Sequence, residues 1–249
     1  MGTSQSSPGS AKNSPLVPSW ANDPALPLPQ PEPARFKQFR QSLGRFVGTR
    51  NGNDLREALG HYARRSSGGG NTASRRMSSV AKAGANLHGF LTGSGEFTAE
   101  ATFNLNSLSG QSCELAIAAI VKGLTPEDGD ADKIQVAMNQ ALVMALDGIE
   151  VFDPAHITDD VIVNTLIFFI AESVFIQVTL EGGKAWNKAS TPPERMAAEN
   201  DLRELIKVVV DQHMAPKFTR SARSFSRNEI IQLEQQVIVD VWTEWEGYV

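Results

Sequence analysis

Residues 161–180 read VIVNTLIFFIAESVFIQVTL, a long and almost uninterrupted apolar run. A run of this length could cross a bilayer. Glu172 would then lie near the bilayer centre at a cost of roughly 3 kcal/mol, and no basic flank sets an orientation. We therefore predict a central helix that is buried on most sides by the protein itself, with no membrane partner. The β-branched residues of the run leave a pair of strands as the alternative.

Apolar residues recur at helical spacing on both sides of this run. Before it, Phe36, Phe39, Leu43 and Phe46 form one stripe on a helix from about residue 35 to residue 47. The same spacing predicts further helices at about 54–65, 77–91, 113–122 and 134–145.

Two capping boxes open the last predicted helices. Thr191 and Glu194 stand three residues apart and enclose prolines at the first helical positions, which favours a helix to about residue 213. Ser226 and Glu229 repeat this spacing before a helix that runs nearly to residue 249. The sequence therefore predicts an all-α fold, an irregular helical bundle.

The first 33 residues differ from the rest in composition, since they hold eight of the thirteen prolines and several serines. Proline fixes φ and removes backbone donors, and few large apolar side chains are available for burial. We predict that residues 1–33 are a disordered N-terminal tail rich in Pro, Ser and Gly. Extended at roughly 3.1 Å per residue, residues 15–33 would reach about 55 Å.

The tip of this tail is a candidate for modification. Gly2 becomes the first residue once Met1 is removed, and its amine would be an accessible nucleophile. One interpretation is a plain solvated terminus. Another is lipid acylation, because Met1-Gly2 followed by Ser6 fits the loose acylation pattern. The third is a substrate or docking peptide for a partner protein.

Apolar residues within the tail favour the docking interpretation. Leu16, Val17 and Trp20 stand among prolines, and a tryptophan in such a segment is typical of an anchor that fills a partner's pocket. Thr3 and Ser4, which follow the tip, belong to the same predicted docking set. Folding back onto the chain's own domain is the alternative.

Charge divides the remainder of the chain. Residues 34–90 carry a net charge of +9, whereas residues 91–249 carry −13. We predict a basic helical subdomain at 34–92 and an acidic helical body at 93–249, packed together as one globular unit.

The basic subdomain centres on ARRSSGGGNTASRR, residues 63–76, where two arginine pairs enclose a glycine loop that leads into a helix. Backbone donors, the helix dipole and four guanidinium groups would converge there on a phosphate, a nucleotide or a nucleic acid. Alternatively, the basic face docks on the acidic half of the chain or on a partner, and the glycines only turn the chain. The candidate anion-binding residues are Arg64, Arg65, Gly68, Gly69, Arg75 and Arg76.

Catalytic patterns are missing from the sequence. The four histidines are scattered, without a second His or Cys at metal-ligand spacing. Neither a nucleophile elbow nor a dinucleotide or phosphate-loop fingerprint can be read. We therefore expect no enzyme activity, no metal and no cofactor. The single cysteine, Cys113, allows no disulfide within the chain, which fits a reducing cytoplasm.

Several motifs of the first 91 residues together resemble a known family. They are MGTS at 1–4, PLVPSW at 15–20, RRSSGG at 64–69, ASRRM at 73–77 and GFL at 89–91. In this combination they are similar to QatB, the B component of Qat anti-phage defence systems. Beyond residue 91 the helices are similar only in character.

The resemblance implies a bacterial, cytoplasmic and non-catalytic defence protein, encoded with an ATPase, a TatD-like nuclease and a QueC-like enzyme. In related systems the QueC-like enzyme is associated with conjugation of a deazaguanine to a protein's N-terminal glycine, which in this chain would be Gly2. The implied role is a partner or scaffold protein that presents its tail to that enzyme. Nucleic-acid or nucleotide binding at the arginine and glycine loop is the alternative.

Overall fold

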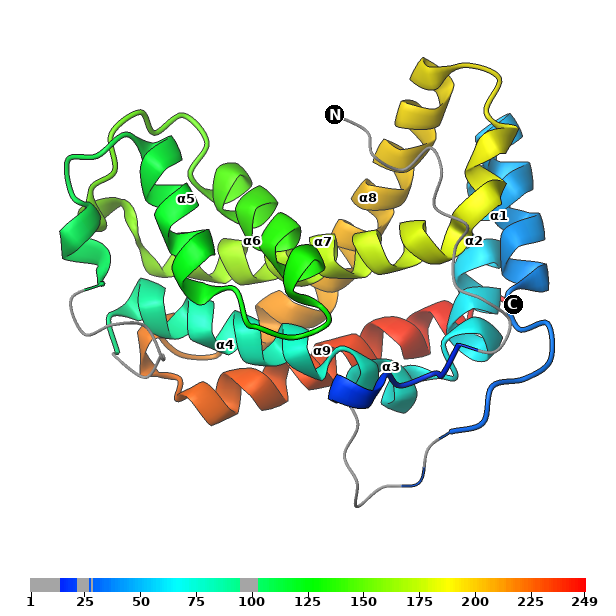
Figure 1. Cartoon of the computed structure of the whole chain (residues 1–249), viewed down its shortest axis with the longest axis horizontal. Coiled ribbons are helices and arrows are strands. Elements are labelled where there is room, and N and C mark those ends of the chain that lie inside the picture. Colours follow the sequence, from blue (N-terminus) through cyan, green and yellow to red (C-terminus); the bar gives the residue numbers. More distant parts are fainter. Residues whose placement is uncertain (1–13, 22–26, 28, 95–102) are drawn as a thin grey trace. The chain divides into compact units, whose positions relative to one another are not determined.

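Helices form along this chain where the apolar spacing predicts them. The computed structural model describes residues 14–21, 27, 29–94 and 103–249. Within these residues the regular secondary structure is helical, apart from an isolated β-bridge between Ser112 and Val151 (Figure 1). The all-α fold class is therefore confirmed.

The α-helices of the described residues follow the chain in a simple order. They are α1 (Lys37–Thr49), α2 (Gly52–His61), α3 (Gly70–Arg76), α4 (Ser78–Thr92), α5 (Cys113–Leu124), α6 (Ala131–Ala145), α7 (Asp159–Gly182), α8 (Pro192–Met214) and α9 (Arg227–Glu246).

Contacts divide the chain into two compact units, and neither unit is one continuous piece of sequence. Unit 1 comprises the described residues up to 77 together with 174–209 and 238–249, and unit 2 comprises those of 78–173 and 210–237. The division falls within α7, α8 and α9, so each of these helices contributes to both units. The charge-based boundary at residue 92 rests on a different property and stays a prediction.

The apolar run at 161–180 forms a single helix, α7, so the strand-pair alternative is wrong. Two of its polar residues are buried, since Glu172 is 4% exposed and Gln177 is 7% exposed, whereas Asn164 is exposed. In the part of the chain that the structure describes, one helix, at 159–188, is long and apolar enough to cross a membrane, and 72% of its most apolar window is buried inside the protein. Such burial agrees with the predicted core helix.

Both predicted capping boxes are confirmed at the starts of α8 and α9. The Glu194 backbone N–H donates to Thr191 Oγ1 at 3.3 Å, and the Thr191 N–H donates to the Glu194 carboxylate at 3.2 Å. Ser226 and Glu229 exchange the equivalent bonds at 2.8 and 3.3 Å. These bonds satisfy first-turn donors that a helix cannot satisfy internally.

The core of unit 1 is built on the apolar stripe of α1. Helices α1 and α2 pack side by side (Figure 1). The rings of Phe39 and Tyr62 stand 4.9 Å apart, Tyr62 and Trp242 stand 6.0 Å apart, and Trp245 lies 5.0 Å beyond Trp242. These four side chains are fully buried, so an aromatic row joins α1, the turn after α2 and the end of α9.

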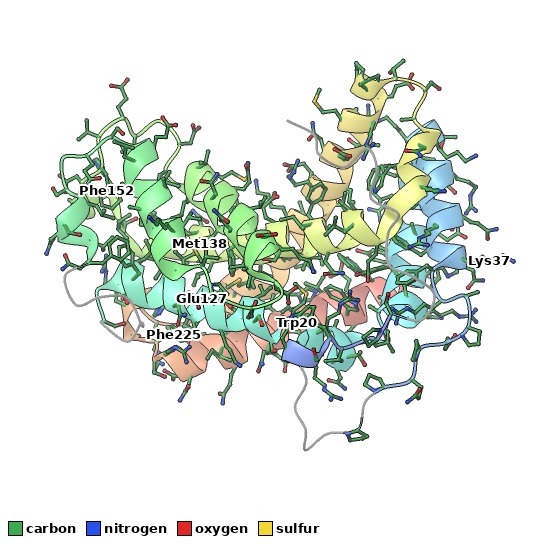
Figure 2. The ribbon with its side chains drawn as sticks, viewed as in Figure 1. Trp20, Lys37, Glu127, Met138, Phe152 and Phe225 are labelled. Atoms are coloured by element: carbon green, nitrogen blue, oxygen red, sulfur yellow. The ribbon has the colours of Figure 1, made fainter. Side chains whose placement is uncertain are left out.

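The core of unit 2 combines α4, α5 and α6 with the connection before α7. Helices α5 and α6 lie side by side (Figure 1), and the rings of Phe90 and Phe103 stack at 4.9 Å. Phe152, labelled in Figure 2, is fully buried, and its N–H donates to the Gln111 carbonyl at 2.9 Å.

The glycine loop is shorter than the sequence predicts. A wide helical turn covers Tyr62–Ser66, and α3 begins at Gly70, so the connection between them is only three residues long. Apolar spacing does not predict helix α3, because this helix is short and has few apolar residues. It depends on Gly70, where a β-carbon would lie 3.0 Å from the Val239 carbonyl oxygen of α9.

Candidate functional site

The candidate site lies where the described residues of the leader, 14–21, 27 and 29–36, pack against other parts of unit 1. The described leader residues include a short 3-10 turn, Ser19–Ala21, closed by the Ala21 N–H on the Pro18 carbonyl at 3.1 Å. Leu16 and Val17 are 3% and 2% exposed. Leu16 and Val17 are therefore packed against the protein and are not part of a freely extended tail.

Leu16 is seated on the glycine loop. Gly68 and Gly69 have φ values of +82° and +85°, which favour glycine. A β-carbon on Gly68 would stand 3.1 Å from Leu16 Cδ1. The two glycines thus turn the chain, and Gly68 also leaves room for the leader.

Two arginines hold the leader by its backbone. Arg35 Nη2 donates to the Ser14 carbonyl, and Arg75 Nη1 donates to the Pro27 carbonyl, each at 2.9 Å. Carbonyl oxygens in a proline-containing segment have few local donors, because proline lacks an N–H. The guanidinium groups supply those donors.

The structure separates the predicted docking residues. Leu16 and Val17 are buried against the protein, as the alternative of folding back onto the chain's own domain predicts. Trp20, labelled in Figure 2, is instead 48% exposed. Gly2, Thr3 and Ser4 lie outside the described residues. Docking of a partner at Trp20 stays a prediction.

The four arginines of the predicted anion site have four different partners. Arg64 Nε donates to the Glu246 carbonyl at 2.8 Å, and Arg65 Nη1 donates to Gln38 Oε1 at 2.9 Å. Arg75 binds the leader, and Arg76 pairs with Glu181 at 2.7 Å. These bonds are therefore spread over unit 1, which resembles the docking alternative more than a shared anion site.

A buried polar network lies within the same unit. The Tyr62 hydroxyl donates to Glu181 Oε2 at 2.7 Å, and Arg76 Nη2 pairs with Glu181 Oε1. Glu181 is 1% exposed, and Arg40 Nε donates to its backbone carbonyl at 2.9 Å. Burial and the adjacent carboxylate raise the pKa of Tyr62 well above its usual value.

Sequence reasoning missed Glu181 as the centre of this network. The sequence presents it only as the acid of an EGGK tetrapeptide after the apolar run. An isolated acid at the end of an apolar helix, with arginines in excess elsewhere, is the signal that could have found it.

Metal and thiol chemistry find little support in the described residues. Among them there is no group of three His, Cys, Asp or Glu side chains that could hold a metal ion. His88 is buried with Nε2 2.8 Å from the Ala222 carbonyl, and burial raises the pKa of the Cys113 thiol. These residues serve packing within unit 2.

Comparison with known protein families identifies a match over most of the chain. The family model described as Qat anti-phage system associated protein QatB matches residues 68–245. No curated protein and no solved structure matches the chain. The matched range holds α3 to α9 except the last residue of α9, and it begins at Gly68, against which Leu16 packs. Because the match covers well over half of the chain, this protein belongs to the QatB family of Qat anti-phage system associated proteins.

Proposed function

We propose that this component of the Qat anti-phage system is a non-catalytic partner protein that presents its N-terminal tail to a QueC-like enzyme. On this proposal the enzyme joins a deazaguanine to the amine of Gly2. The observation that carries it is the anchor formed by Leu16, Val17 and the Ser14 carbonyl on unit 1. Because the leader is held at Ser14, the residues before it are tethered to one position on the protein.

The anchor limits where the tip can act. Gly2 lies twelve positions before Ser14, and this stretch spans at most about 40 Å when extended. An enzyme that binds at the exposed face of Trp20 would therefore find Gly2 within its reach. Anchoring of this kind raises the effective concentration of a tethered substrate.

Intact-mass spectrometry tests the modification. The chain is co-expressed with the QueC-like enzyme of its system, and we expect a mass increase that maps to the first residue. Gly2→Ala retains a small second residue, so Met1 is still removed, and we expect this variant to be modified far less. An N-terminus that is merely trimmed, beside an active enzyme, would contradict the proposal.

Trp20→Ala tests the docking surface. We expect slower modification with an unchanged unfolding midpoint, because Trp20 is half exposed. Met196→Ala is the matched control, since Met196 is another apolar side chain of unit 1 and is 60% exposed. Equal rates for the two variants would remove Trp20 from the docking surface.

Nucleic-acid or nucleotide binding is the second candidate, favoured by the exposure of Arg64 and Arg65. It predicts affinity that falls steeply with salt. Replacing the exposed Arg64 and Arg65 by Ala should then weaken binding in a folded protein, and wild-type affinity after replacing Arg64, Arg65, Arg75 and Arg76 by Ala would exclude the candidate. We place both activities in the cytoplasm, with the ATPase and the TatD-like nuclease as further partners.

A further inference from the structure

Unit 2 exposes apolar side chains on helices α5 and α6. Four of the eight large apolar side chains that the described residues expose lie between residues 115 and 151. Leu115 of α5 is 63% exposed, and Val136 and Val143 of α6 are 58% and 46% exposed. Val151, in the connection after α6, is 55% exposed. Single exposed apolar residues are normal, whereas their concentration on two neighbouring helices indicates a contact surface.

Val136 and Val143 share one face of α6, because residues seven positions apart are separated by almost two turns of a helix. At 1.5 Å per residue they stand about 10 Å apart along the helix axis. The core face of the same helix carries Ile134, Met138 and Ala141, which are fully buried. The two valines therefore point away from the core of unit 2.

Leu115 lies on the neighbouring helix, at the end closest to Val143. Helices α5 and α6 pack side by side (Figure 1), and the Cys113 N–H at the start of α5 donates to the Glu150 carbonyl, just beyond the end of α6, at 2.9 Å. The two helices are thus antiparallel. Because both turn their buried sides to the same core, their exposed sides adjoin. We call this surface the α5–α6 face, and it consists of Leu115, Ala118, Val136 and Val143.

Acidic residues surround the α5–α6 face. Residues 113–153 hold eight acidic and two basic residues, a net charge of −6. Within this fully described stretch Lys122 is the one exposed base, since Lys133 is half-buried and pairs with Asp130 at 2.9 Å. Six of the acids are exposed, namely Glu114, Glu127, Asp132, Asp147, Glu150 and Asp153. The exposed apolar side chains therefore lie in a negative electrostatic field.

This charge distribution decides between possible occupants of the face. Symmetric pairing with a second copy would place a net charge of −6 against another −6, and like charges across an interface are unfavourable. A cationic partner is attracted instead. The spacing of Val136 and Val143 matches two turns of a helix that presents its own apolar residues three, four and seven positions apart.

We propose that the α5–α6 face binds an amphipathic helix of another protein, whose apolar stripe packs on Leu115, Val136 and Val143 and whose polar side is rich in Lys and Arg. The apolar contacts supply affinity, and the surrounding acids favour a cationic partner and speed its association. The face belongs to unit 2, whereas Trp20 and the anchor of the leader belong to unit 1. The inference therefore does not depend on the function proposed above.

Fluorescence anisotropy with three synthetic peptides tests the face on the full chain. The first peptide, of about 15 residues, has leucines along one face of a helix and lysines at its other positions. The second has the same composition in scrambled order, and the third has glutamate in place of each lysine. We expect the first peptide to bind, more weakly as the salt concentration rises, and the other two to bind about tenfold or more weakly than the first.

Matched valine variants locate the binding surface. Val136 and Val208 are both 58% exposed on long helices, but Val208 lies on α8 in unit 1. We expect Val136→Ser to weaken binding of the leucine and lysine peptide about fivefold, because apolar contact area is lost. Val208→Ser should bind this peptide like the wild type.

Matched acid variants test the electrostatic part of the proposal. Asp132 stands one turn before Val136 on the same side of α6, and Glu204 is an exposed acid of α8 in unit 1. We expect Asp132→Asn to weaken binding of the leucine and lysine peptide about threefold at low salt and less at high salt. Glu204→Gln should leave the affinity unchanged.

Four results would overturn the proposal. Equal binding of the ordered and scrambled peptides would reveal only a general attraction between opposite charges. Equal affinities for Val136→Ser and Val208→Ser would place binding elsewhere, and absence of binding at about 0.1 mM peptide would remove the surface altogether. A dimer of the chain alone that Val136→Ser dissociates would assign the face to a second copy.

Discussion

The carboxyl group of Glu234, on α9, lies directly against Gly84, on α4, where a β-carbon would overlap both of its oxygens. Glu234 is fully buried, and neither oxygen has a hydrogen-bond partner among the described residues. Both residues belong to unit 2. A glycine inside a helix therefore makes room for an acid that a core would ordinarily exclude.

Gly84→Ala should destabilise the protein although alanine is the better helix former. The added methyl group collides with the Glu234 carboxyl group, and we expect a loss of about 1–3 kcal/mol in the free energy of urea unfolding. Gly48→Ala is the control, because its β-carbon would meet only the Lys188 carbonyl at 3.9 Å. That change should be neutral or stabilising by up to about 1 kcal/mol.

A double variant separates collision from other effects of Gly84→Ala. Glu234→Ala empties the space beside Gly84, so the two changes together should destabilise less than the sum of the single changes. Strict additivity would contradict the contact.

Glu234→Gln should change how stability depends on pH. Burial raises the pKa of Glu234 well above its usual value, so the folded state holds this proton at pH values where the unfolded state has released it. Stability from this group is complete below the unfolded pKa of about 4.3 and is lost as the pH rises toward the folded pKa. From pH 5 to pH 8, the urea midpoint of the wild type should therefore fall relative to that of Glu234→Gln. Parallel pH profiles of the two proteins would contradict a raised pKa for Glu234.

Removing Arg76 should cost far more than removing an exposed arginine of the same unit. Arg76→Ala removes the cation that pairs with the buried Glu181 carboxylate, and we expect a loss of about 3–5 kcal/mol in unfolding free energy. Arg50 pairs with Asp201 at 2.6 Å, with side chains 50% and 37% exposed. Arg50→Ala should cost about 0.2–1 kcal/mol, and less at high salt. Similar losses for both variants would argue against a structural role for the Tyr62, Glu181 and Arg76 network.

Leu16→Ala should release the leader without unfolding the helices. Loss of a buried leucine costs roughly 2 kcal/mol or more, and in this segment the cost falls on local docking. We expect trypsin to cleave after Arg35 about tenfold faster while the global urea midpoint stays nearly constant. Trp20→Ala, at a half-exposed position, should cleave like the wild type, and unchanged cleavage of Leu16→Ala would show that Leu16 does not hold the leader.

The sequence predicts the helices well because their signals are local. The stripe of Phe39, Leu43 and Phe46 and the capping boxes at Thr191 and Ser226 require only residues a few positions apart. Helix α3 was missed because its seven residues have little apolar character and so carry no periodic signal. Its first residue, Gly70, packs closely against the Val239 backbone, a contact that the sequence does not reveal.

The candidate sites were harder to predict because they depend on contacts between distant residues. Arg76 and Glu181 are more than one hundred positions apart, and Arg35 reaches back to Ser14. Clustering in the sequence suggests that Arg64, Arg65, Arg75 and Arg76 act together, whereas in the structure they bond to different partners. Arg35 and Arg40, whose guanidinium groups do lie together over the ring of Phe36, come from the start of a helix that the sequence marks only by its apolar stripe.

The interleaving of the two units decides how binding partners can be mapped on this protein. Because α7, α8 and α9 each contribute residues to both units, cutting the chain at any point between residues 78 and 237 removes part of at least one unit. Fragments would then lose binding through misfolding whichever surface a partner uses. Surface point substitutions in the intact chain are the experiment that this topology permits.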